Sequence, residues 1–181
     1  MDVMREAEDI NSLRVLIAGG RPHSVQLLRQ IFDMLGIRRV HVAAQLDAAI
    51  EFLRTYRYAA VFCDEQIGDP DAFVSSARRA PDLVDPMVPI FLVCGGPKRR
   101  DVEAARDLGF TDVLTRPVSA ATVSRKLTTA TTHPRPFIAS SAFFGPDRRT
   151  AARGWSGGER RTRAPRKIKV PKRTDLRLTD D

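Results

Sequence analysis

The residues best suited to chemistry in this chain lie where its apolar runs end. Asp64, Cys94 and Arg116 each end or directly follow such a run, and the pair Gly19 and Gly20 follows the first one. A carboxylate can accept a transferred group or hold a divalent cation. A guanidinium beside it would instead occupy the carboxylate with charge-assisted hydrogen bonds. Which chemistry applies depends on whether the fold brings these positions together.

Five short apolar runs alternate with segments of helical periodicity. The runs cover residues 13–18, 38–43, 58–63, 88–94 and 111–115. Between them, apolar residues recur at spacings of three and four, which predicts amphipathic helices. This alternation predicts an α/β domain with a doubly wound parallel sheet of five strands. Ligand sites of such folds lie beyond the carboxyl ends of the strands, which is where the polar positions above fall.

Three segments in order resemble the receiver domain of response regulators, over residues 12–131. They are residues 15–22, residues 60–72 and residues 109–117. They are similar to the family's first strand, to its third strand with the acceptor aspartate, and to the glycine-to-Lys-Pro segment of its fifth strand. The resemblance implies a flavodoxin-like sheet with strand order 2-1-3-4-5.

The resemblance also implies a site, and the site departs from the family pattern. Asp64 matches the phosphoacceptor, which requires Mg²⁺ held by further carboxylates to neutralise charge during transfer. Gly19 and Gly20 match the acidic pair, Cys94 matches the hydroxyl position, and Arg116 matches the lysine. We therefore expect a degenerate pocket with an Asp64–Arg116 ion pair, weak or absent Mg²⁺ binding and no catalytic residues.

Simpler interpretations of the same residues stay open. In one of them, Asp64 is an acid at the end of a strand and has no function. In another, Gly19-Gly20-Arg21 forms a tight turn; a phosphate-binding loop is the alternative, although the following residues do not have the spacing of the known phosphate-binding motifs. The three histidines are scattered and predict no metal site. The two cysteines are expected to be inert core thiols of a reduced cytosol.

Positive charge is concentrated at the C-terminus. Residues 133–181 hold 13 of the 30 Lys+Arg and 5 of the 22 Asp+Glu, which leaves 17 of each and no net charge for residues 1–132. We divide the chain into an N-terminal extension, 1–11, a receiver-like domain, 12–131, and a disordered, arginine-rich tail, 132–181. Removal of the tail is expected to leave a folded, neutral domain.

The tail contains a short repeat of aromatic-x-Gly-x-acid-Arg-Arg, found at 143–149 and 155–161. Arginine forks bind phosphate or guanine edges, and aromatic rings stack on bases. The tail resembles that of some alphaproteobacterial receivers, which implies binding of cyclic di-GMP. The expected contacts are Arg148, Arg149, Arg153, Trp155, Arg160 and Arg161. Non-specific binding of nucleic acid by the tail is the other alternative.

The primary hypothesis is a stand-alone receiver protein of two-component phosphorelay signalling that acts through protein contact. Its partner would be a kinase, a flagellar component or a transcriptional component. No enzyme activity is expected, because no complete catalytic constellation is present. We expect a cytoplasmic protein with no membrane association, since no apolar run approaches the roughly 18 residues of a membrane span.

Overall fold

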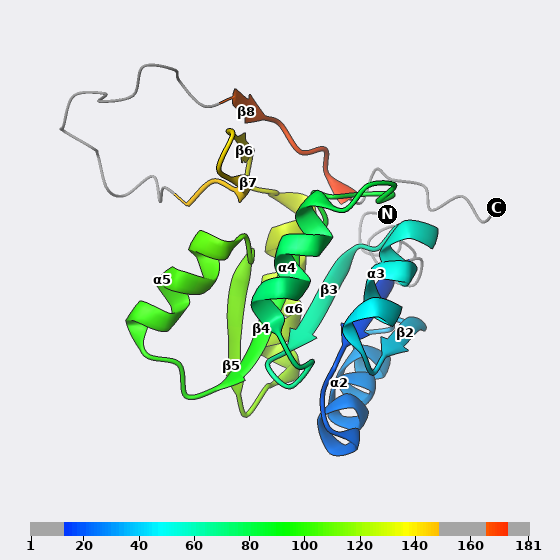
Figure 1. Ribbon diagram of the computed structural model, residues 1–181. Coiled ribbons are helices and arrows are strands. Elements are labelled where there is room, and N and C mark those ends of the chain that lie inside the picture. Colours follow the sequence, from blue (N-terminus) through cyan, green and yellow to red (C-terminus); the bar gives the residue numbers. More distant parts are fainter. Residues whose placement is uncertain (1–12, 149–165, 174–181) are drawn as a thin grey trace.

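A computed structural model describes residues 13–148 and 166–173 of the chain (Figure 1). Its centre is a parallel five-stranded sheet in the order β2-β1-β3-β4-β5. The strands are β1 (Arg14–Ala18), β2 (Arg39–Ala43), β3 (Ala60–Asp64), β4 (Ile90–Gly95) and β5 (Asp112–Arg116). This confirms the predicted flavodoxin-like topology. All five carboxyl ends therefore reach the same edge of the sheet.

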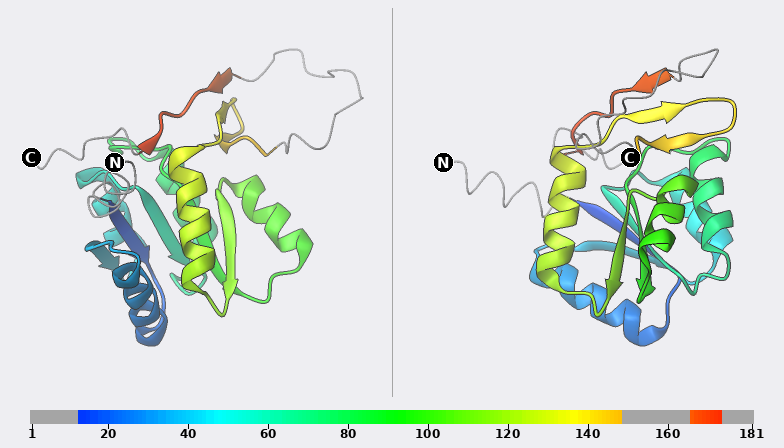
Figure 2. Two further views of the ribbon diagram at one scale, coloured as in Figure 1. Left: turned by 180° about the vertical axis from the view of Figure 1, so that it is seen from behind. Right: turned by 90° about the vertical axis from the view of Figure 1, so that its left-hand side faces the viewer.

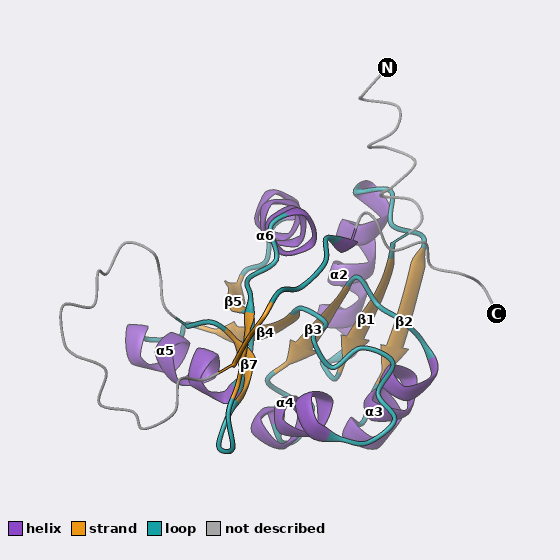
Figure 3. Ribbon diagram, turned by 90° about the horizontal axis from the view of Figure 1, so that it is seen from above, coloured by secondary structure: helices purple, strands orange, loops and turns teal. Residues whose placement is uncertain are grey.

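Five helices cover the two faces of this sheet (Figure 3). They are α2 (Pro22–Met34), α3 (Leu46–Thr55), α4 (Pro70–Arg79), α5 (Arg99–Leu108) and α6 (Ala120–Thr132). Helices α2 and α6 pack on one face, around Phe32, Phe62 and Leu114. Helices α3, α4 and α5 pack on the other, around Phe73 and Ile90. Because both faces are covered, the central strands are apolar almost throughout.

The helix ends follow the signals in the sequence. The side chain of Ser119 accepts a hydrogen bond from the backbone N–H of Thr122 and caps α6. Gly109 ends α5 with a φ of +118°, in the left-handed region that favours glycine. Asp69 caps α4 in the same way as Ser119 caps α6. No helix among the described residues is long and apolar enough to span a membrane.

A second, smaller sheet follows α6. It is antiparallel, in the order β7-β6-β8, and consists of β6 (Phe137–Ala139), β7 (Phe144–Pro146) and β8 (Arg166–Ile168). We call it the C-terminal sheet. Figure 2 shows it beyond the ends of α4 and α6, at the edge of the central sheet where the strands begin. It therefore lies opposite the edge that carries Asp64.

This sheet lies within the segment 132–181, which the sequence predicts to be a disordered tail. Its three short strands are described there, and Phe137 and Val170 are buried. Glycine allows one close approach, because a Cβ on Gly145 would lie 3.2 Å from the Cα of Gly109. These strands are only three residues long and lie among prolines and arginines, so the sequence pattern did not predict them. Residues 149–165 and 174–181 lie outside the described part.

Candidate functional site

Asp64 is the last residue of the central strand β3, and its side chain is only 1% exposed. Its Oδ1 accepts a hydrogen bond of 2.9 Å from the backbone N–H of Gln66. Its Oδ2 accepts a bond of 2.5 Å from Nη2 of Arg116, at the end of β5. The predicted Asp64–Arg116 ion pair is thereby confirmed.

Arg116 also holds a second carboxylate. Its Nη1 donates to Oε1 of Glu65, so the guanidinium fork bridges two neighbouring acids. The same Glu65 oxygen accepts from the backbone N–H of Gly95, at the end of β4. Burial opposes the charge on Arg116, but the hydrogen bonds to Asp64 and Glu65 outweigh it and raise its pKa. The cation is therefore permanent, and it joins the ends of three strands.

The two glycines at the end of β1 leave no room for the missing acids. Gly19 and Gly20 have φ values of +79° and +103°, which side chains rarely adopt. A Cβ at Gly19 would lie 2.6 to 2.9 Å from Ile67, including its backbone, and one at Gly20 would lie 3.2 Å from Oδ2 of Asp64. Any residue with a side chain, an acid included, would therefore be strained at these two positions.

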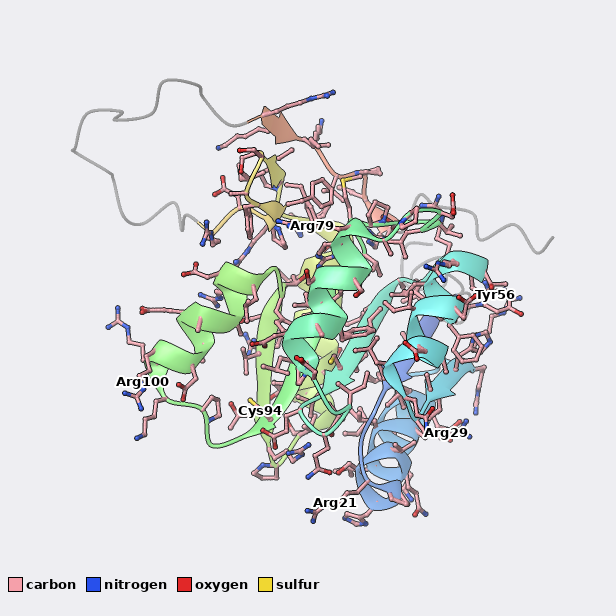
Figure 4. All side chains as sticks on the ribbon, in the orientation of Figure 1. Arg21, Arg29, Tyr56, Arg79, Cys94 and Arg100 are labelled. Carbon is pink, nitrogen blue, oxygen red and sulfur yellow. The ribbon has the colours of Figure 1, made fainter. Side chains whose placement is uncertain are left out.

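Cys94, labelled in Figure 4, lies on β4 where the family pattern has a hydroxyl, one residue before Gly95, which pairs in register with Arg116. Burial, together with the negative charge of Glu65, raises the pKa of its thiol. It is therefore protonated at neutral pH and can offer only a weak S–H donor. Cys63, one strand away, is buried as predicted, and burial raises its thiol pKa as well.

The residues at this edge do not fit a divalent cation. Figure 4 shows Arg21 below the sheet and directed away from it. Asp64 and Glu65 supply the carboxylates here, and both are already bound by one guanidinium. Nowhere in residues 13–148 and 166–173 do three or more His, Cys, Asp or Glu side chains form a group able to hold a metal ion. A cation at Asp64 would first have to displace Arg116.

Most of the predicted nucleotide contacts lie outside the described residues, namely Arg149, Arg153, Trp155, Arg160 and Arg161. Arg148 is described, and its guanidinium pairs with Asp107 of α5 and lies 4.4 Å from the ring centre of Phe143. The first copy of the repeat thus contributes to the C-terminal sheet and ties it to α5. Nothing in the described residues brings the predicted contacts together, so nucleotide binding stays a prediction.

Comparison with solved structures shows which known proteins share this fold. Solved structures similar to this chain include the receiver domain of a sensor histidine kinase from Pseudomonas aeruginosa, with magnesium in its active-site cleft. The two are 22% identical with a TM-score of 0.57, over 65% of this chain and 95% of that one. A chemotaxis protein of Vibrio cholerae is 18% identical with a TM-score of 0.57, over 64% and 96%. No family model matches, and neither does any curated protein.

A third similar structure is the receiver domain of the response regulator Ssk1 from Saccharomyces cerevisiae, solved with a histidine phosphotransfer protein. It is 20% identical with a TM-score of 0.55, over 65% of this chain and 87% of that one. At such identities the comparison concerns architecture. The chain has the fold of response-regulator receiver domains, and Asp64 lies at the edge of the sheet that carries the carboxyl ends of its strands.

Proposed function

We propose that this chain is a receiver-fold signalling protein whose phosphoacceptor pocket is degenerate and which acts through contact with a protein partner. The observation that carries the proposal is the Arg116 fork on Asp64 and Glu65. In an intact site, a divalent cation neutralises clustered carboxylates. Here a permanent side-chain cation neutralises them instead, and the nucleophilic oxygen of Asp64 is held by a hydrogen bond.

The surroundings support the same function. Phosphoryl transfer depends on positioning and on charge stabilisation at the transferred group. Gly19 and Gly20 contribute no carboxylate, Cys94 contributes only a thiol, and Arg116 is already engaged. The partner would be a kinase, a flagellar component or a transcriptional component. Binding of cyclic di-GMP or nucleic acid through the arginine-rich segment remains a separate prediction.

The first test is chemical phosphorylation of the full chain with acetyl phosphate and Mg²⁺, followed by intact-mass measurement. We expect no stoichiometric adduct, because the neighbouring Gly19 and Gly20 offer no carboxylate for Mg²⁺ and both oxygens of Asp64 already accept hydrogen bonds. The control is Asp64→Asn, which keeps the size of the side chain and removes the acceptor. An adduct on the unmodified chain that disappears in Asp64→Asn would contradict the degenerate pocket.

A second test removes the side chain that replaces the metal. Arg116→Ala leaves Asp64 and Glu65 facing each other without a counter-charge, so we expect tighter Mn²⁺ binding, by about tenfold. Calorimetric titration measures it. The matched control is Arg21→Ala, at the same edge, which removes the same charge but frees neither carboxylate. Equal gains in the two variants, or none in Arg116→Ala, would show that Arg116 does not compete with a cation.

A further inference from the structure

A cavity of about 230 Å³ lies far from Asp64, where the C-terminal end of α6 meets the C-terminal sheet. Its walls come from the start of β4 and β5, from α6, and from the chain on both sides of the C-terminal sheet. Apolar side chains form much of it, among them Met87, Phe91, Phe137 and Val170. The cavity therefore exists only because the chain returns to this edge after α6.

The charged groups of the cavity are unbalanced. Arg125, Lys126, Arg135 and Arg173 line it, and Asp112 is the one carboxylate among its lining residues. Asp112 is already engaged, by Lys126 and by Nη2 of Arg106 at 2.8 Å. Burial opposes its ionisation, but these two hydrogen bonds outweigh burial and lower its pKa. The lining thus keeps an excess of positive charge.

All three arginines of the lining have N–H groups without a hydrogen-bond acceptor in the part of the protein that the structure describes. Within residues 13–148 and 166–173, the side chains of Arg125 and Arg135 have no hydrogen-bond or ion-pair partner. Arg173 is only 4% exposed and binds Asp85 through Nη1, yet its Nε has no acceptor. A buried N–H without an acceptor is costly, commonly by about 1–3 kcal/mol. Arg125 is exposed and Arg135 is half-buried, so an anion at this site would replace the water around their donors with charge-assisted hydrogen bonds and would lie beside the buried Arg173.

We propose that this cavity binds a small organic anion, in which an apolar ring or chain carries one carboxylate or phosphate group. The apolar walls would receive the ring, and Arg125 and Arg135 would bind the anionic group in the fork geometry that suits both head groups. A volume of about 230 Å³ is small for a ligand site, which limits the ligand to about one or two rings. This site goes beyond the proposed signalling function and does not depend on it.

The test is a calorimetric titration of the full chain with naphthoate and, separately, with naphthyl phosphate, which distinguishes the two head groups. We expect binding of one equivalent of at least one of them. Either Arg125→Gln or Arg135→Gln should weaken it about fivefold to tenfold through the loss of a charge-assisted hydrogen bond. Neither arginine has a partner among the described residues, so both variants should retain the stability of the unmodified chain.

Two controls separate a site from general attraction of anions. Arg29→Gln removes the same charge from the exposed side of α2, and it should leave binding unchanged. The methyl ester of naphthoate keeps the ring and removes the charge, so it should bind much more weakly. The proposal is overturned if neither probe gives saturable binding, if Arg29→Gln weakens binding as much as Arg135→Gln, or if the ester binds as well as the acid.

Discussion

Replacing Arg78 by methionine is expected to lower the free energy of unfolding by about 2–4 kcal/mol, since it leaves buried carbonyl groups without donors. Arg78 is the next to last residue of α4 and is almost completely buried. Its guanidinium donates four hydrogen bonds, two to the carbonyl oxygen of Gly109 and one each to those of Pro86 and Val88. One side chain thereby joins α4 to the entry of β4 and to the end of α5.

The charge on Arg78 makes this arrangement unusual. Among the described residues, no carboxylate lies within ion-pair distance of it, and carbonyl dipoles replace a counter-ion. Burial lowers its pKa to about 9, which still leaves the side chain protonated at pH 7. The ring of Phe137, in β6, covers it with its centre 5.1 Å from the guanidinium carbon. The C-terminal sheet therefore keeps water from a charge that belongs to the central domain.

Urea denaturation of the two proteins measures the effect of Arg78→Met. The neighbouring Arg79→Met is the matched control, because Arg79 is more exposed and makes a single hydrogen bond, to the carbonyl oxygen of Ala142. We expect the control to change stability by less than about 1 kcal/mol. Similar losses in both variants would mean that the buried carbonyl contacts of Arg78 contribute little.

The sequence predicts the central sheet well, because its signals are local. Apolar runs mark the strands, and capping residues and glycines mark helix ends, such as Ser119 at the start of α6 and Gly109 at the end of α5. The Asp64–Arg116 pair is also predictable. Once the strand order is known, the residues at the ends of β3 and β5 must meet at one edge of the sheet.

The missed features depend on contacts between residues distant in the sequence. Nothing around Arg78 distinguishes it from the exposed Arg79, since its role appears only when β4, α5 and β6 are packed around it. Arg173 lies in a basic run whose composition is typical of disorder, and its acceptors are 86 to 115 residues earlier in the chain. The requirement for glycine at position 19 likewise appears only in the folded chain, because a Cβ there would lie 2.6 Å from the Cβ of Ile67.

Arg173 links the C-terminal part of the chain to the central domain. Its substitution should therefore lower the free energy of unfolding, as the substitution of a core residue does. Its Nη1 donates to Asp85 and to the carbonyl oxygen of Tyr58, and its Nη2 donates to that of Met87 at 2.9 Å. Asp85 is itself largely buried, and its other cation is Arg57 at 3.7 Å. Removal of one partner from a buried pair is usually costly, because the remaining charge stays desolvated.

We therefore expect Arg173→Met to lower the free energy of unfolding by about 2–3 kcal/mol, slightly below the usual cost because Arg57 still compensates Asp85. Truncation after residue 132 should be worse, since it also uncovers Arg78 and removes Phe137 and Val170 from the core. This revises the expectation that the shortened chain would be an intact domain.

A double-mutant cycle in urea denaturation tests the mechanism. Asp85→Asn in the Arg173→Met background removes the stranded charge, so the double variant should recover about 1–2 kcal/mol relative to the sum of the single losses. Lys172→Met is the matched control, since Lys172 is the exposed neighbour of Arg173 and should tolerate the change. Strictly additive losses would contradict the coupling between Asp85 and Arg173. A truncated chain as stable as the full one would show that the C-terminal segment does not stabilise the central domain.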